Sequence, residues 1–563
     1  MQTLSEKNGI WKLFLGVTAS SIVILLPVAF LGLDLEDRGF HIYEQLQTFN
    51  KFGFPSKMIL LTNWLGGAWL SLSGGKFLYA WSVVGGLLLA GINLGIAALI
   101  VKELFPTVSN KKLGLFCLAG VLCAIYTQTF FSIDYYPVPL LTTELFLLFF
   151  IKSRYSEDKI KIIAYYILAG FFAGITPFMR LPTVYLLGVP LVYELLAVYY
   201  GAPRCFSVIY FYLTAIATAA TGYFIFTIFL QNFSEYSIAV KMLERRSFVE
   251  ILKIPLDYLW LCFIHLPLAI IILLLFVFVK KTKLLENRLI IACCFSVIGV
   301  LGIAYLYWAY DKYGMYFGIF PLGLYRKLLE VIPIALSVAL LIPAKFEKNN
   351  SLFLQFPRSE ICLQILMICG VFILFPFGSN TGLLKVRYGF PVLLPICFIV
   401  LEKYFDSMNK TFISIMCAAL FTSLIFTPSA TYCDANRLCC RYMPKSQQLC
   451  GIFSSEEKVL QTDRVVSELK KYTVDNEEIL IFGVDYTILI AAGCRSWCNM
   501  GYNPPKAAKI MFSRYCEKKA LPKTAFAHKS DKSYADFGKA FLEQHYKIVF
   551  EDNTYTVWQK QKL

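Results

Sequence analysis

Three acidic side chains lie within four residues early in the chain, at Asp34, Glu36 and Asp37, and aromatic residues follow at Phe40 and Tyr43. Carboxylates that are crowded beside a low-dielectric medium have raised pKa values, which suits a general base. An acidic cap at the end of a membrane-spanning helix would explain the same residues without any chemistry. The spacing alone therefore leaves both interpretations open.

A second acidic residue, Asp134, lies in the short segment Ser132–Pro137 between two apolar runs. Because the segment is short, Asp134 must stay close to the membrane surface. Its structural alternative is a hydrogen-bonded acid with no role in chemistry. Glu144 falls inside the next apolar run, where an unpaired carboxylate is costly.

Four basic residues lie in segments that the topology below places on the same side as these acids, namely Arg180, Arg326, Lys385 and Arg387. Lys and Arg are normally depleted on the outer side of a membrane, so each needs a specific reason. Arg makes paired hydrogen bonds with phosphate, and a lipid phosphate lies at this depth. The alternative is an interfacial anchor or a partner for the acids. For Arg180 and Arg387 we favour phosphate binding.

The composition predicts that these residues belong to an integral membrane protein. Of 563 residues, 58% are hydrophobic and only 16% are charged, whereas about a quarter are charged in soluble proteins. That much apolar surface cannot be hidden in a globular core, so lipid must cover much of it. The net charge of +16 does not call for nucleic acid, because Lys and Arg gather in short clusters between apolar runs.

About thirteen apolar segments have the length of membrane-spanning helices. The first, Leu13 to Leu33, is expected to be a retained signal anchor. The others are expected at 77–101, 113–131, 137–151, 162–178, 183–200, 206–230, 257–279, 289–308, 328–343, 360–377, 388–401 and 411–427. The long first outer loop, 34–76, is amphipathic and aromatic, which favours helices lying in the membrane interface.

The distribution of charge orients these helices. With the N-terminus in the cytoplasm, Lys and Arg are about twice as dense in the inner segments as in the outer loops. The chain then divides into a transmembrane domain, 1–427, and an extracytoplasmic domain, 428–563. This orientation puts the acids and arginines above on the outer side, where we expect a bacterial inner (plasma) membrane.

The C-terminal domain is predicted to be a small α/β domain. Ser454–Glu457 resembles a capping box, Glu478–Gly483 predicts a buried strand, and residues 546–558 predict a hairpin. No G-x-G-x-x-G motif follows the strand, so no nucleotide site is predicted. An oxidising outer compartment favours disulfides over a zinc site for the seven cysteines in or just before this domain. They are Cys433, Cys439, Cys440, Cys450, Cys494, Cys498 and Cys516.

Outer acids beside outer arginines suit the transfer of a sugar from a lipid phosphate, in which a carboxylate activates the acceptor and cations stabilise the leaving group. In architecture the whole chain resembles the GT-C superfamily of glycosyltransferases, and within it the protein O-mannosyltransferase and lipid A aminoarabinose transferase group. Members carry an acidic motif after the first helix, often Asp-Glu followed by an aromatic residue. Glu36-Asp37 stands in that place with the order reversed. The base therefore stays open among Glu36, Asp37 and Asp34, and we favour Asp37.

Three further matches carry the resemblance. Asp134 resembles the second acid of the family, Arg180-Leu181-Pro182 its Arg-x-Pro element, and Arg387-Tyr388 with Pro391 its Arg-Tyr-x-x-Pro segment. The resemblance implies a GT-C-like bundle, a polyprenyl-phosphate-linked sugar donor and inverting displacement. It leaves open the acceptor, which is a lipid, glycan or protein, and a divalent metal between Asp37 and Asp134.

Other functions compete with this interpretation. A transporter or flippase of lipid-linked glycans would place ionisable groups near the membrane midplane, whereas most charges here lie at the ends of the predicted helices. A glycan polymerase or ligase would use similar groups on the outer face, so the sequence separates it poorly from a transferase.

Overall fold

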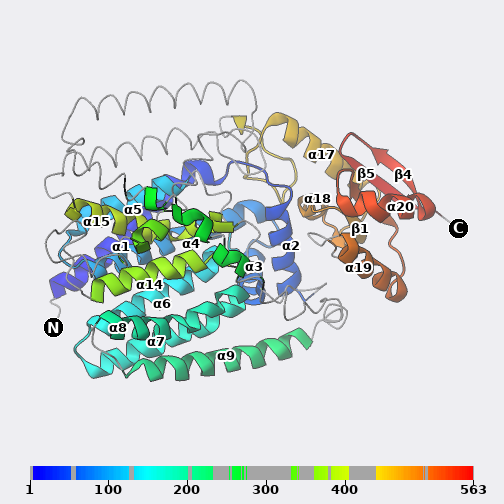
Figure 1. Cartoon of the computed structure of the whole chain (residues 1–563). Coiled ribbons are helices and arrows are strands. Elements are labelled where there is room, and N and C mark those ends of the chain that lie inside the picture. Colours follow the sequence, from blue (N-terminus) through cyan, green and yellow to red (C-terminus); the bar gives the residue numbers. More distant parts are fainter. Residues whose placement is uncertain are drawn as a thin grey trace.

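The computed structural model is mainly helical, with one small mixed sheet near the C-terminus (Figure 1). It describes residues 4–51, 59–125, 132–200, 206–231, 360–377, 382–404, 439–498, 500 and 505–561, with short stretches between 253 and 340. The helices predicted at 289–308 and 411–427 lie outside these residues, as does Arg326.

The described part of the transmembrane domain is a bundle of apolar helices. In chain order they are α1 (Leu4–Ala29), α4 (Leu78–Leu104), α5 (Asn110–Ile125), α6 (Pro137–Tyr155), α7 (Lys159–Met179), η2 (Leu181–Leu187), α8 (Val189–Tyr200), α9 (Val208–Gln231), α14 (Glu360–Leu374), η4 (Gly382–Gly389) and α15 (Phe390–Tyr404). Within the bundle α6 packs against α4 and α7, and α15 packs against α5. The elements η2 and η4 are short 3-10 helices, each of which leads into an α-helix.

Five described segments are long and apolar enough to cross a membrane, namely Gly9–Ala29, Leu78–Leu104, Lys159–Met179, Leu181–Val198 and Val208–Phe229. All five coincide with predicted helices. The predicted helices at 113–131, 137–151, 360–377 and 388–401 also form, as α5, α6, α14 and α15. Large apolar side chains remain exposed along α9, which is what contact with lipid requires. These segments support an integral membrane protein.

The long first outer loop contains the helices α2 (Asp37–Phe49) and α3 (Leu60–Ser71). Figure 1 shows α2 lying across the end of the bundle, between the bundle and the C-terminal domain. Helices therefore form in this loop as expected, and most residues of α2 are buried within the protein. The loop is tied to the bundle by Trp69 and Trp81, whose rings stack and whose indole N–H groups each donate to the carbonyl of the other, both at 2.8 Å.

The C-terminal domain is built on a five-stranded sheet with the order β2-β1-β3-β5-β4. Its elements are α17 (Glu456–Lys470), β1 (Glu478–Phe482), α18 (Tyr486–Ala492), β2 (Arg495–Ser496), α19 (Pro505–Lys518), β3 (Thr524–His528), η6 (Tyr534–Gly538), α20 (Lys539–His545), β4 (Tyr546–Glu551) and β5 (Tyr555–Lys560). Strand β1 pairs in parallel with β2 and β3, and β5 pairs antiparallel with β3 and β4. The predicted strand and hairpin therefore both form.

Strand β1 is apolar on both faces because both faces are covered. Ile479 and Ile481 belong to the large apolar cluster that includes α18 and the bundle, whereas Leu480 and Phe482 pack in a second cluster with α19. One face of the sheet is thus directed toward the membrane domain. This arrangement brings α18 against α2.

The expectation of disulfides is wrong for four of the described cysteines. Cys439, Cys450, Cys494 and Cys516 carry free thiols. Cys494 is buried after α18 with its Sγ 3.8 Å from the Ala492 carbonyl oxygen, whereas Cys516 is exposed on α19. These elements do not bring the thiols together. Cys433 lies outside the described residues.

Candidate active site

Asp34 caps the start of α2. Its Oδ1 accepts hydrogen bonds from the backbone amides of Glu36 at 2.9 Å and Asp37 at 3.2 Å, and its Oδ2 accepts one from the amide of Arg38 at 2.8 Å. Burial raises the pKa of Asp34 to about 6, and the neighbouring Asp37 carboxylate adds to the effect. Because both carboxyl oxygens bind amides that have no partner within the helix, Asp34 shapes this turn.

Glu36 and Asp37 are directed to different neighbours. Glu36 is exposed and lies in the electrostatic range of Lys458 and Asp485 of the C-terminal domain. Asp37 begins α2, and His41 lies one turn later on the same side of the helix. The adjacent carboxylates of Glu36 and Asp37 thus lie on different sides of α2.

His41 marks the side of α2 that faces the bundle. Its ring centroid lies 4.9 Å from that of Tyr135. Burial lowers the pKa of His41, and the carboxylates of Asp134 and Asp37 oppose this shift. Both acids therefore lie within electrostatic range of one imidazole, although they are separated by almost one hundred residues in the sequence.

The short loop before α6 holds Asp134 in a fixed position. Asp134 is 2% exposed. Its Oδ2 accepts a hydrogen bond from the Ser132 hydroxyl at 2.7 Å, and its Oδ1 accepts one from the backbone amide of Tyr136 at 2.9 Å. The rings of Tyr135 and Tyr136 follow directly and pack on each other with centroids 4.3 Å apart.

Two stacked tyrosines lie between Asp134 and the basic residues. The rings of Tyr136 and Tyr388 are nearly parallel, with centroids 5.1 Å apart. The Lys385 Nζ lies 4.5 Å from the centroid of Tyr136, and the Arg180 Cζ lies 5.0 Å from it. Aromatic faces stabilise cations without neutralising their charge. The stack therefore gathers positive charge beside Asp134.

The two arginines differ in what holds them. Arg180 donates to the backbone carbonyls of Phe375 and Phe377, the latter at 2.8 Å, just beyond the end of α14. Arg387 is 6% exposed, and its Cζ lies 5.6 Å from the ring of Tyr388. Its Nε–H is buried without a hydrogen-bond partner among the described residues. A buried unsatisfied N–H of a charged group is costly, so an anion is the natural partner here.

The structure thus brings Asp37, Asp134, Arg180, Lys385 and Arg387 to one end of the bundle, and it gives Asp34 and Glu36 other surroundings. The sequence did not single out His41, Tyr135, Tyr136 and Tyr388 as site residues. A signal was present in each case, because they follow Asp37 by one helical turn or flank Asp134 and Arg387 directly.

Asp37 and Asp134 are the pair that the resemblance would assign to a divalent metal. Within the described residues, no group of three or more His, Cys, Asp or Glu side chains is placed to hold a metal ion. Both oxygens of Asp134 already accept hydrogen bonds within their own loop. A divalent metal between Asp37 and Asp134 stays a prediction, and the steps below involve none.

The chain is similar to two solved structures in overall fold. One is the oligosaccharyltransferase of Archaeoglobus fulgidus tethered with an acceptor peptide, at 11% identity over 98% of this chain and 74% of that one, with a TM-score of 0.49. Another is ArnT from Cupriavidus metallidurans in the apo state, at 13% identity over 98% of both chains, with a TM-score of 0.43. No protein-family model and no curated protein sequence matches the chain.

Proposed function

We propose that this protein is a membrane glycosyltransferase that moves a sugar from a polyprenyl-phosphate donor to a lipid, glycan or protein acceptor on the outer face of the membrane. The observation that carries the proposal is the meeting of Asp37 and Asp134 with Lys385 and Arg387 around the Tyr136–Tyr388 stack. Acids and cations that converge at one membrane surface supply both a base and a binding site for phosphate.

The basic side of the cluster would bind the donor phosphate. Negative charge grows on this group as the bond between the sugar and the phosphate oxygen breaks. The buried Nε–H of Arg387 and the ammonium of Lys385 then stabilise that charge more strongly than the charge of the intact donor. Arg180, fixed by the two carbonyls after α14, keeps further positive charge against Tyr136.

The acidic side would activate the acceptor. In our proposal the Asp37 carboxylate takes the proton of an acceptor hydroxyl or amine as that atom forms a bond to the anomeric carbon. The electron pair of the breaking bond stays on the phosphate oxygen, so the products are a glycosylated acceptor and polyprenyl phosphate. Attack from the side opposite the phosphate inverts the anomeric carbon. Asp134, anchored by Ser132 and the Tyr136 amide, maintains negative potential beside His41.

The topology belongs to the same proposal. It comprises about thirteen membrane-spanning helices, an N-terminus in the cytoplasm of a bacterial cell, and a soluble domain, 428–563, outside the inner membrane. The position of the cluster supports this sidedness, since it lies at the end of the bundle that adjoins the C-terminal domain (Figure 1).

A flippase for lipid-linked glycans is the second candidate, and Glu144 is the observation in its favour. This residue is fully buried in α6, and neither of its carboxyl oxygens has a hydrogen-bond partner among the described residues. Acids of this kind mark transport pathways in many membrane proteins. Transfer chemistry would not need Glu144, so Glu144→Gln should leave glycosyl transfer intact if the main proposal is correct.

Purified protein in proteoliposomes can separate the two functions. We expect radiolabelled sugar to pass from at least one donor in a panel of polyprenyl-phosphate-linked hexoses and pentoses to a membrane-extract acceptor, with release of polyprenyl phosphate. Asp37→Asn should abolish this transfer. The proposal would be overturned if every donor moved between leaflets or bound without being consumed by folded protein.

A further inference from the structure

Thr487 of α18, in the C-terminal domain, contacts the turn that carries the acidic motif. The Thr487 Oγ1 lies 2.8 Å from the Leu35 carbonyl oxygen and 3.1 Å from that of Asp34, and it also bonds the hydroxyl of Tyr79 on α4. A hydroxyl carries a single proton. If Thr487 donates to the carbonyls, Tyr79 must donate to Thr487, and a chain of hydrogen bonds then joins the bundle, the C-terminal domain and the turn before Asp37.

Gly39 makes this contact sterically feasible. A Cβ atom at Gly39 would lie 2.3 Å from the Thr487 Oγ1, 2.5 Å from the Thr487 amide nitrogen and 2.8 Å from the Tyr79 hydroxyl. Two of these are the atoms that form the hydrogen-bond chain. Glycine therefore lets α2 approach α18 closely enough for the chain to close.

Other contacts fix the rotation of α2 about its axis. The Tyr43 hydroxyl accepts a hydrogen bond of 2.8 Å from the backbone amide of Ser496. The Tyr486 ring lies 4.9 Å from that of Tyr43 and 5.4 Å from that of Phe40, between centroids. The face of α2 that carries Phe40 and Tyr43 thus packs against the C-terminal domain. The face that carries Asp37 and His41 is directed toward the bundle.

We propose that Thr487 is a positioning residue, through which the C-terminal domain holds the Asp34–Leu35 carbonyls and so sets the Asp37 carboxyl against Asp134. This role rests on the proposed function, because Asp37 is its proposed base. The Asp34 carboxyl can cap α2, but the hydrogen bonds that it accepts come from the amides of residues 36–38, within the turn itself. The hydroxyl of Thr487 provides an external attachment.

The test compares Thr487→Val with Thr487→Ser and uses Thr524→Val as a matched control. Thr524 is another fully buried threonine of the same domain, and its hydroxyl donates to the Tyr472 carbonyl at 3.0 Å, away from α2. The readouts are hydrogen exchange of the amides of residues 36–40 in the full-length protein and, separately, kcat and donor KM. A shift of about 1 Å at a reacting group can cost about 100-fold in rate.

We expect Thr487→Val to speed exchange at residues 36–40 and to lower kcat by about 10- to 100-fold, with donor KM changed less than about twofold. Thr487→Ser should restore both, and Thr524→Val should change neither. Thr487→Ala, which removes the hydroxyl and adds no bulk, should reproduce the Thr487→Val pattern, and it covers the case in which valine impairs folding.

Native exchange at residues 36–40 in Thr487→Val would overturn the inference, as would an equal fall of kcat in Thr524→Val. If the wild-type protein transfers no sugar, the proposed function fails, but the exchange data still show whether Thr487 holds the turn.

Discussion

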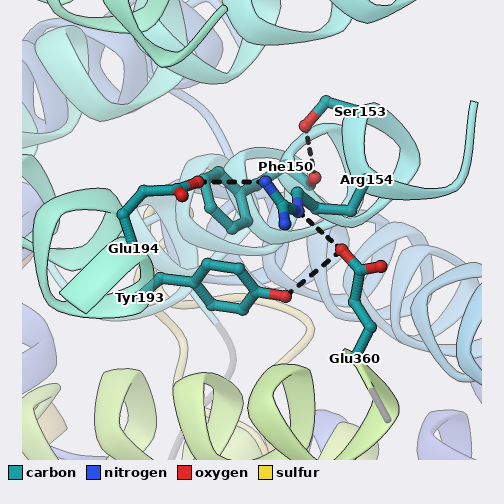
Figure 2. A network of polar contacts seen from close by, with 6 residues as sticks. All are labelled: Phe150, Ser153, Arg154, Tyr193, Glu194 and Glu360. Carbon is teal, nitrogen blue, oxygen red and sulfur yellow. Dashed lines mark hydrogen bonds and ion pairs between the residues drawn. The ribbon is translucent and has the colours of Figure 1, made fainter. Parts of the chain in front are cut away.

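Two groups of buried charges lie at opposite ends of α6, and they differ in how the charges are satisfied. The group near its C-terminal end is centred on Arg154, whose side chain is 3% exposed (Figure 2). Its Nε donates to Glu360 at 2.6 Å and its Nη1 to Glu194 at 3.0 Å. The Tyr193 hydroxyl donates to the same oxygen of Glu360 at 3.5 Å. This group ties α6, α8 and α14 together.

At the other end of α6, Arg180 and Arg387 are held by contacts of a different kind. The Nε–H of Arg387 is buried and lacks a partner within the described residues, and Arg180 is oriented by backbone carbonyls. Lys385 lies over the Tyr136 ring. The comparison indicates two roles for buried arginines. One that is enclosed by carboxylates stabilises the fold, whereas one that is supported by aromatic rings and carbonyls can still bind an anionic ligand.

The largest expected effect comes from the acidic motif. Asp37→Asn should lower the rate of glycosyl transfer by about 10²- to 10⁴-fold, the usual contribution of a general base. The matched control is Glu36→Gln, one residue earlier but directed to the C-terminal domain, and it should retain activity within a few-fold. Single-turnover transfer from a labelled donor measures both variants. A reversed ranking would move the base to Glu36 and would break our division of α2 into two faces.

Arg154→Met should lower the stability of the folded protein and leave the rate of transfer unchanged. Removing this guanidinium leaves Glu194 and Glu360 in a mostly buried site without their partner, which costs about 3–5 kcal/mol. Thermal unfolding of the detergent-purified protein should show a clearly lowered midpoint, while the fraction that remains folded keeps its kcat. If the variant unfolded like the wild type and lost turnover, the two ends of α6 would not differ as we infer.

Arg387→Gln should show the opposite pattern. It removes a charged donor whose Nε–H has no partner among the described residues, so the unfolding midpoint should stay the same or rise slightly. The value of kcat/KM for the donor should fall by about 10- to 100-fold, as expected for a lost hydrogen bond to a charged group. Donor titrations at several salt concentrations would check this result. Unchanged kcat/KM would remove Arg387 from the phosphate site.

Much of the membrane domain could be predicted from sequence because hydropathy is a local property. The same holds for Asp134, Arg180 and Arg387, which attract attention as charges at positions where a membrane protein normally avoids them. The expected topology put their segments on one side of the membrane and so predicted that they could meet at one end of the bundle.

The remaining features depend on contacts between distant parts of the chain. Arg154 and Glu360 are 206 residues apart, and no local pattern links them. The separate roles of Asp34, Glu36 and Asp37 depend on which face of α2 meets the C-terminal domain, and Thr487 of that domain is an ordinary residue in the sequence. The disulfide prediction was wrong for Cys439, Cys450, Cys494 and Cys516 for the same reason, because composition and compartment do not determine whether two thiols meet.

The smallest effect concerns Asp485, a carboxyl at the junction of the C-terminal domain with Glu36. It accepts a hydrogen bond from the Tyr555 hydroxyl at 3.1 Å. Burial raises its pKa from 3.8 to about 7, and the charge of Glu36 adds to the shift. The folded protein keeps this proton below pH 7, whereas the unfolded chain has already lost it. Stability should therefore fall by about 1.4 kcal/mol between pH 6 and pH 8 through this group alone.

Asp485→Asn isolates that contribution, because the amide keeps an acceptor for Tyr555 but cannot ionise. Burial also raises the pKa of Glu44 to about 7, so the variant should reduce the loss of stability between pH 6 and pH 8 without abolishing it. Unfolding by denaturant at both pH values gives the difference. An unchanged pH dependence would mean that Asp485 is ionised in the folded protein. Asp485 would then resemble the paired carboxylates around Arg154.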